Sequence, residues 1–127
     1  VLYFYPRDDT PGCTVEACEF TAENAQLTKL GAKVYGCSPD KPEAHQKFIA
    51  KHQLGIGLLA DVEKAVLPKY GAWGEKVLYG KRHLGVVRST FLIDPEGVLR
   101  AEWRGVKVTG HAQAVLDALM DARKNAG

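Results

Sequence analysis

Two cysteines five residues apart, Cys13 and Cys18, are the residues of this chain whose type and spacing could do chemistry. Cys13 follows a polar, proline-punctuated loop that ends the apolar run of residues 1–5, and a helical pattern begins next to it. Backbone N–H groups and the dipole at a helix start stabilise an anion, so this position favours a thiolate. A buried free cysteine acting as a small hydrophobe is the alternative. It fits less well, because Cys13 stands in a polar loop, and we expect a reactive thiolate.

Cys18 raises a geometric question. Five residues apart on a helix, two side chains differ by about 140° in direction and about 7.5 Å in axial rise. A disulfide needs Cα atoms within about 7 Å. Cys13 and Cys18 therefore cannot pair while the helix is intact. Two interpretations stay open: Cys18 is a packing residue, or the first helical turns unwind and Cys18 resolves an oxidised Cys13.

The remaining sulfur and imidazole groups suggest no further centre. Cys37 ends the second apolar segment beside a glycine and is expected to be a core residue. The three cysteines lack the paired C-x₂-C spacing of zinc modules. The histidines, at positions 45, 52, 83 and 111, form no Cys–His pair at readable spacing, which disfavours a papain-like hydrolase.

Two polar residues, Thr10 and Arg88, could assist a thiolate. Thr10, three residues before Cys13, is either a cap residue or a hydroxyl aimed at a bound substrate. Arg88 lies in an otherwise apolar stretch and needs a partner. That partner is either a carboxylate at a strand end, or the thiolate, with the guanidinium also holding a developing oxyanion. Glu16 is expected only to favour the helix dipole.

The elements around these residues follow from hydrophobic period and turn signals. We expect strands at residues 1–5, 32–38, 58–60, 85–94 and 98–104, and helices at 14–30, from 42 onward, 62–70 and 110–124. We expect Val15 and Cys18 to lie on the apolar face of the first helix, and His45 to lie mostly on the outer face of the second. Residues 71–84, with Trp73 and Tyr79 as anchors, are expected to be a long loop.

This order predicts an α/β fold. Strand–helix–strand alternation implies parallel pairing through right-handed crossovers, and the hairpin at the back adds antiparallel strands. The result is a mixed central sheet with helices on both faces. Sites in such folds gather where the carboxyl ends of strands meet helix starts, which is where Cys13 stands.

Bulk properties narrow the functional classes. The 127 residues are expected to form one domain, residues 1–127. With 17 basic and 15 acidic residues spread along the chain, no basic face for nucleic acid is indicated. The apolar runs are too short for a membrane span. Three cysteines, an odd number, argue against a disulfide-stapled secreted scaffold and towards cysteines that are reactive or buried. We expect a cytoplasmic location.

The motif Pro6-x-x-x-Thr10-x-x-Cys13 resembles the active-site motif of peroxiredoxins. The longer run at residues 4–18, FYPRDDTPGCTVEAC, is similar to the peroxiredoxin Q group, also called bacterioferritin comigratory proteins. So are YGAWGEK at 70–76, YGK at 79–81 and VRSTFLIDPEG at 87–97. The resemblance covers nearly the whole chain.

The resemblance implies a thioredoxin-like fold and a thiol peroxidase acting on hydrogen peroxide and organic hydroperoxides. Cys13 matches the peroxidatic cysteine and Cys18 the resolving cysteine. Thr10 and Arg88 match the residues that orient the peroxide and stabilise the thiolate. The substrate pocket is expected to include Pro6, which shields it, and Gly12. It further implies thioredoxin or glutaredoxin as reductant, a monomer, and no metal, flavin or nucleotide cofactor. Such proteins normally have a further segment, with a hairpin, before the first strand seen here.

Two other functions follow from the same chain. A disulfide oxidoreductase of the thioredoxin type would need C-x-x-C, and the spacing here is longer. A non-catalytic thioredoxin-fold module that binds partners or acts as a chaperone would have unreactive cysteines, so thiol titration separates it from a peroxidase.

Overall fold

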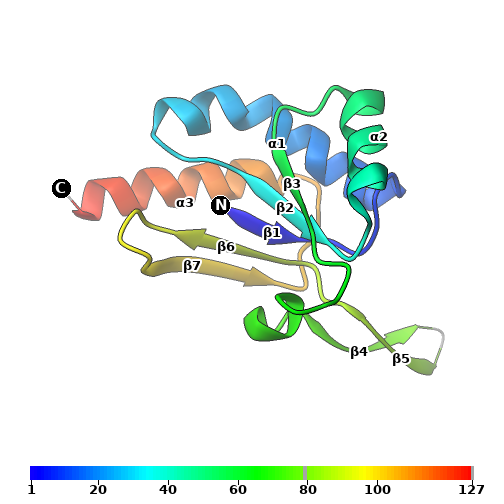
Figure 1. Cartoon of the computed structure of the whole chain (residues 1–127). Helices are drawn as coiled ribbons and strands as arrows, with labels where there is room; N and C mark the ends of the chain where they lie inside the picture. The colour runs from blue at the N-terminus through cyan, green and yellow to red at the C-terminus, as the bar shows by residue number, and fades with distance from the viewer. Residues whose placement is uncertain (79, 127) are drawn as a thin grey trace.

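The computed structural model of the chain describes residues 1–78 and 80–126, with three α-helices, one 3₁₀ turn and seven strands (Figure 1). In chain order they are β1 (Leu2–Phe4), α1 (Pro11–Lys29), β2 (Tyr35–Ser38), α2 (Pro42–His52), β3 (Gly57–Ala60), the 3₁₀ turn η1 (Leu67–Tyr70), β4 (Trp73–Leu78), β5 (Lys81–Val86), β6 (Ser89–Ile93), β7 (Leu99–Arg104) and α3 (His111–Ala126).

The central sheet has five strands in the order β3-β2-β1-β6-β7. β1, β2 and β3 are parallel, whereas β6 and β7 run antiparallel to their neighbours. This confirms the mixed sheet of the predicted α/β fold. In the register, Phe4 at the carboxyl end of β1 is opposite Cys37 on one side and Ser89 on the other. Arg88, the residue before Ser89, therefore lies at the edge of the sheet where α1 begins.

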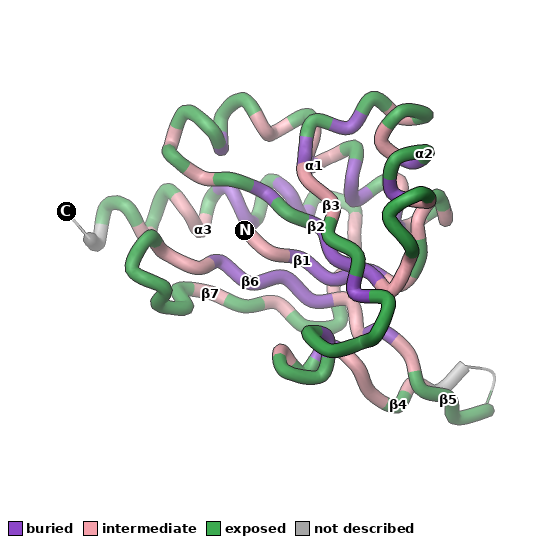
Figure 2. The backbone as a smooth tube through the Cα atoms, viewed as in Figure 1, coloured by how far each residue is buried: buried purple, intermediate pink, exposed green. Residues whose placement is uncertain are grey.

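The two faces of the sheet are covered differently. Tyr3 of β1 and Tyr5, the residue after β1, point into a core shared with α1, α2 and α3, where Phe20 and Phe48 are buried. Phe4 points the other way, into a smaller core closed by the 3₁₀ turn η1 and the base of the β4–β5 hairpin. Residues of β1 and β6 are buried along most of their length (Figure 2). The helical cover of the second face is thus a single turn.

The region from 71 to 84 was predicted wrongly. Instead of a loop it forms a two-stranded antiparallel sheet of its own, with Trp73 opposite Val86. The hairpin extends away from the central sheet (Figure 1), so its side chains show little of the burial alternation that marks a strand in sequence. Trp73 is a strand residue, and Tyr79 lies outside the described residues.

Two helix faces also differ from expectation. α1 begins at Pro11, three residues early, and its buried stripe includes Cys13, Glu16 and Phe20, while Val15 and Cys18 are exposed. On α2, His45 was expected outside but is buried, three residues before Phe48 and on the same face. Both differences place a polar group inside the protein, and both bear on the site.

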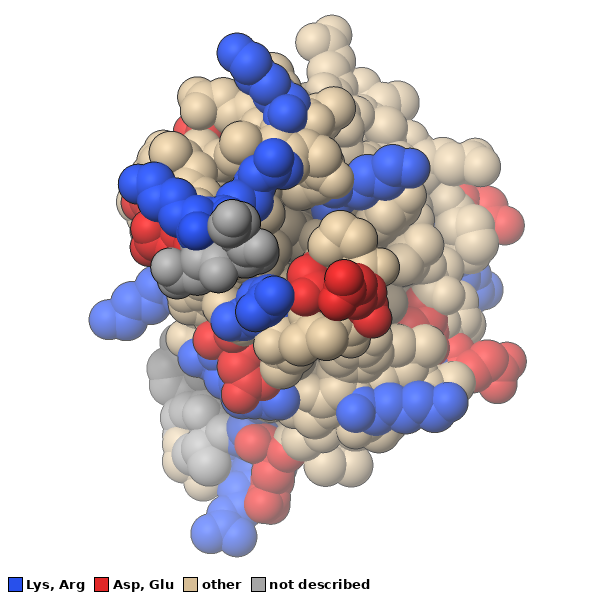
Figure 3. Space-filling view, turned by 90° about the vertical axis from the view of Figure 1, so that its left-hand side faces the viewer, with Lys and Arg blue, Asp and Glu red and all other residues tan. Residues whose placement is uncertain are grey.

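The surface carries mixed charge on the face shown in Figure 3, where Lys and Arg alternate with Asp and Glu and neither sign gathers. Among the helices within residues 1–78 and 80–126, none is both long enough and apolar enough to cross a membrane.

Candidate active site

The start of α1 leaves backbone N–H groups without partners in the helix. Thr10 holds the N-cap position with extended backbone, φ −93° and ψ 156°, and Pro11 begins the helix. The first helical bond runs from the N–H of Thr14 to the carbonyl of Thr10 (2.8 Å). The N–H groups of Gly12 and Cys13 therefore precede the helical ladder and are available to an anion. Cys13 itself is buried, with only 1% of its surface exposed.

Arg88 joins the thiol to a buried carboxylate. It lies between β5 and β6, not within a strand as predicted. Its Nη2 donates to Cys13 Sγ at 3.3 Å and its Nη1 donates to Glu16 Oε1 at 2.6 Å. Both contacts use one planar fork, which a lysine could not reproduce. Of the alternatives for Arg88, the structure contains both: an ion pair and a guanidinium beside the sulfur.

Burial and neighbouring charges shift the pKa values of Glu16, Arg88 and Tyr3. Burial raises the pKa of Glu16 to about 7, although the guanidinium opposes the rise. Burial works against the charged form of Arg88, but Glu16 and Cys13 hold its pKa above the ordinary value. Burial, with Glu16 and Cys13 nearby, also raises the pKa of Tyr3 well above normal. Among the described residues, Glu16 Oε2 and the Tyr3 hydroxyl have no hydrogen-bond partner.

The other predicted pocket residues, Pro6, Thr10 and Gly12, lie in the loop before α1 and in its first turn. Thr10 donates its hydroxyl to the carbonyl of Arg7 (2.9 Å) and makes no side-chain cap on α1. Its oxygen lone pairs are therefore open to a donor. A methyl group at Gly12 would stand 3.4 Å from Arg88 Nη2, which places this glycine beside the guanidinium. Pro6 is half-buried in the same loop. Hydrogen bonds join Arg88 directly to Cys13 and to Glu16, whereas the hydroxyl of Thr10 bonds to Arg7.

The three cysteines have different environments. α1 is continuous through Cys13 and Cys18, and all three thiols are free. Cys18 is exposed on the outer side of α1, away from buried Cys13. Cys37 is buried on β2, where burial and the negative charge of Asp61 raise its pKa to about 11. Cys18 is thus the accessible thiol, and Cys37 is held protonated in the core.

A second polar cluster adjoins the site and was missed in the sequence. Asp8, from the loop between β1 and α1, contacts His45 of α2 (Oδ2 to Nδ1, 2.6 Å) and accepts from the Tyr5 hydroxyl (2.6 Å). Asp40 accepts from the backbone N–H of Asp8 (2.8 Å) and from Ser38 (2.7 Å). The spacing of His45 three residues before the buried Phe48 was the available signal.

This cluster also has the composition of a cation site. Ligand atoms of Asp8, Asp40 and His45 lie within 4.8 Å of one another. However, His45 Nε2 contacts the carbonyl of Leu59 (2.9 Å), and its Nδ1 is taken by Asp8. A metal would have to displace one of these internal bonds, so the donor set fits a hydrogen-bonded network better.

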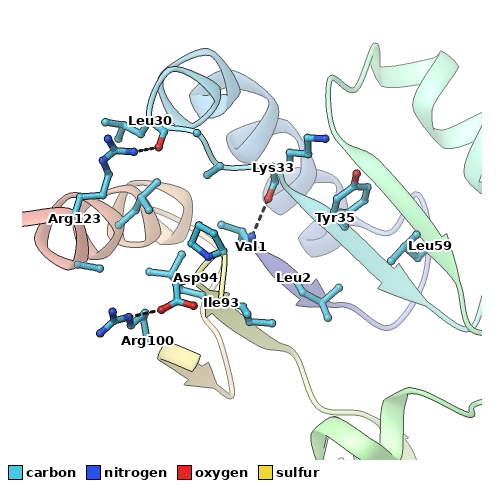
Figure 4. A pocket seen from close by; sticks show the side chains of 16 residues that line it. Val1, Leu2, Leu30, Lys33, Tyr35, Leu59, Ile93, Asp94, Arg100 and Arg123 are labelled. Atoms are coloured by element: carbon cyan, nitrogen blue, oxygen red, sulfur yellow. Dashed lines mark hydrogen bonds and ion pairs between the residues drawn. The ribbon is translucent and has the colours of Figure 1, made fainter. Parts of the chain in front are cut away.

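The apolar pocket drawn in Figure 4 lies at the opposite end of the sheet from Cys13. Its volume is about 570 Å³, and it is lined by the first residues of β1 and β2 and the last turns of α3. Three of its charged lining groups are engaged: Asp94 with Arg100 (2.9 Å) and Arg123 with the carbonyl of Leu30. It contains no thiol and is separate from the site at α1.

The chain is similar to known proteins over most of its length. The profile of the AhpC/TSA family matches residues 1–102. The chain is 51% identical over 119 residues to a putative peroxiredoxin Bcp of Helicobacter pylori (strain J99), covering 94% of this chain and 78% of the relative. It is 48% identical over 121 residues to peroxiredoxin Bcp of Bacillus subtilis, covering 95% and 77%.

Solved structures give the same result. The bacterioferritin comigratory protein of Xanthomonas campestris, studied for alkyl peroxide reduction, superposes with a TM-score of 0.90 at 45% identity, covering 95% of this chain and 77% of that one. Peroxiredoxin Q of Xylella fastidiosa gives 0.91 at 38% identity, covering 96% and 76%. The thioredoxin-like fold and the peroxiredoxin resemblance are both confirmed. The chain therefore belongs to the AhpC/TSA family and, within it, to the Bcp or peroxiredoxin Q group of thiol peroxidases, which use a hydroperoxide substrate and a thiol reductant.

Proposed function

We propose that Cys13 is the peroxidatic cysteine of this thiol peroxidase and that Cys18 resolves it. The observation that carries the proposal is the contact of Arg88 Nη2 with Cys13 Sγ at the open start of α1. A cation and free helix N–H groups beside one sulfur favour its thiolate, which is the nucleophilic form. The substrates are hydrogen peroxide and organic hydroperoxides.

The first step is attack of the Cys13 thiolate on the distal oxygen of the hydroperoxide. The S–O bond forms as the O–O bond breaks, and the leaving oxygen takes up a proton and departs as alcohol or water. Thr10 already donates its hydroxyl to Arg7, so its oxygen can accept the O–H of the substrate and orient it. Arg88 and the N–H groups of Gly12 and Cys13 stabilise the charge that develops during transfer. Cys13 is left as a sulfenic acid.

The second step joins two sulfurs that α1 keeps apart. Cys13 is buried and Cys18 exposed on one continuous helix, so the first turns of α1 must unwind before they meet. The Cys18 thiolate then attacks the Cys13 sulfur, the S–O bond breaks, and the oxygen leaves as water after protonation. A dithiol reduces the disulfide by exchange and restores both thiols.

The test is mass spectrometry after one equivalent of peroxide, together with steady-state peroxide consumption. We expect a Cys13–Cys18 disulfide in the parent protein. Cys13→Ser should abolish turnover, whereas Cys18→Ser should leave a sulfenic acid that a dimedone-type probe labels at Cys13. Cys37→Ala is the matched control and should turn over like the parent, because Cys37 is buried away from the site. Parent-level peroxide consumption by Cys13→Ser would refute the assignment.

We also infer that the reductant is thioredoxin or glutaredoxin, and that the chain works as a monomer in the cytoplasm. Both proposed redox cysteines lie on one helix, so the disulfide needs no second subunit. Three cysteines, an odd number without a dense disulfide pattern, suit a reducing compartment. Turnover with each purified reductant system, sedimentation of the reduced protein and cell fractionation test the three points separately.

A further inference from the structure

The loop that carries the site is tied to α2 by a buried pair. The side chains of Asp8 and His45 are each only 5% exposed, and their closest atoms are 2.6 Å apart. Asp8 is held at two further points, by the Tyr5 hydroxyl on its carboxylate and by Asp40 on its backbone N–H, while the opposite ring nitrogen of His45 contacts the Leu59 carbonyl. We call the Asp8–His45 pair the loop clamp.

The protons of the loop clamp can be assigned from its partners. A carbonyl oxygen only accepts, so His45 Nε2 must carry a proton to bond the Leu59 carbonyl. The contact of Nδ1 with Asp8 then holds a single shared proton, either on the ring or on the carboxyl. Tyr5 donates to the other carboxyl oxygen. Every hydrogen-bonding atom of the two side chains is therefore used, and the pair can be broken only at the cost of leaving a buried polar group unpaired.

The loop clamp lies directly before the part of the loop that serves catalysis. Arg7, whose carbonyl orients Thr10, precedes Asp8, and the next residue, Asp9, adopts a left-handed backbone with φ 58°. A non-glycine residue in that region is disfavoured and persists only when its surroundings hold it. Thr10 and the first turn of α1 follow at once. Fixing Asp8 therefore fixes both the Thr10 hydroxyl and the direction from which the chain enters α1.

We propose that the Asp8–His45 loop clamp is a positioning site that favours the wound form of the first turns of α1 over the unwound form needed for disulfide formation. This rests on the proposed function, in which α1 unwinds between the two chemical steps. Breaking the clamp should affect those steps in opposite directions. Attack on peroxide slows because Thr10 is less often in place, and resolution by Cys18 speeds up because unwinding is easier.

The experiment separates the two steps by rapid quench and mass spectrometry, following reduced, sulfenic, disulfide and sulfinic forms of Cys13. For His45→Leu, we expect attack to slow and disulfide formation to accelerate, each on the order of tenfold, as the loss of a buried hydrogen bond allows. Less sulfinic acid should accumulate at high peroxide. Asp8→Asn is the conservative single variant. Its amide can donate to neutral His45 and its carbonyl can accept from Tyr5, so both rates should lie closer to the parent values than those of His45→Leu.

Lys51→Gln is the matched control, because Lys51 binds the same loop from the same helix through an exposed ion pair with Asp9 (2.7 Å). Such pairs contribute little, so its rates should stay near those of the parent. If His45→Leu does not fold, Tyr5→Phe removes one bond of the cluster and should give a smaller change of the same signs. Unchanged rates, equal slowing of both steps, or an equal effect of Lys51→Gln would overturn the proposal. A parent protein that forms no Cys13–Cys18 disulfide would instead refute the proposed function.

Discussion

Glu16 should make the stability of this protein depend on pH in a way that one substitution removes. Burial raises its pKa from 4.5 to about 7, so the folded protein binds a proton that the unfolded chain has released. The stability contributed by protonated Glu16 is fully present below about pH 4.5 and is lost as pH rises through about 7. One proton corresponds to about 1.4 kcal/mol per pH unit, or about 3 kcal/mol over the whole range.

A second buried group acts in the opposite direction. Burial, with the charge of Arg88, lowers the pKa of His111 from 6.5 to about 4, and its ring contacts Thr90 (2.7 Å). The stability that neutral His111 contributes is present above about pH 6.5 and is lost as pH falls through about 4. Between about pH 4.5 and 6.5 the two slopes cancel. Within this range, neither group should contribute a slope to the pH profile of the parent protein.

Urea unfolding of Glu16→Gln, His111→Gln and the parent protein at several pH values separates the contributions of Glu16 and His111 to stability. From about pH 5 to about pH 6.5, the free energy of unfolding of Glu16→Gln minus that of the parent should rise by about 2 kcal/mol. For His111→Gln the same difference should fall by about 2 kcal/mol. A constant loss from the broken Arg88 pair shifts the first curve without changing its slope. Differences that do not vary with pH would refute the protonation states assigned to both groups.

Three further outcomes are expected. Arg88→Lys, which cannot reach both Glu16 and Cys13, should slow the reaction with peroxide by about 10²-fold in stopped-flow assays; a near-parent rate would contradict the role of the fork. In the native protein at about pH 8, iodoacetamide should label exposed Cys18 and spare Cys37, whose pKa is raised to about 11, until urea is added. Amides of residues 14–18 should exchange hydrogen faster than those of residues 20–27 of the same helix; equal protection would argue against unwinding.

The sheet could be predicted from sequence because its strands are buried in a regular way. The apolar segment that contains β1 and the turn between β6 and β7 carry strong local signals, and the right-handed crossover rule orders the first strands. The β4–β5 hairpin could not be predicted, because its strands pair only with each other and pack little, so neither burial nor alternation marks them. Alternation of apolar and polar residues indicates a strand only where one face of that strand packs against a core.

The site was predictable where a residue's type conflicts with its local surroundings. A cysteine in a polar loop and an arginine in an apolar stretch both stand out, and the structure places them 3.3 Å apart. Glu16 and His45 were missed because acidic and basic residues on helices usually face solvent. Their burial depends on partners distant in sequence, Arg88 for Glu16 and Asp8 for His45. Such pairs follow from tertiary packing and cannot be read from helical spacing.

The weakness of the α1 start and its chemistry have the same origin. The Thr10 hydroxyl does not cap the helix, Gly12 occupies the second helical position, and the first turn has no acidic residue. A missing cap and a helical glycine each cost about 1 kcal/mol of helix stability. Yet an occupied cap would fill the N–H groups that the proposed mechanism uses to stabilise the reacting peroxide, and an acidic side chain would repel the proposed Cys13 thiolate. Capping and catalysis therefore exclude each other here, and the folded form must be held from outside the helix, by Arg88 on one side and by Asp8 on the other.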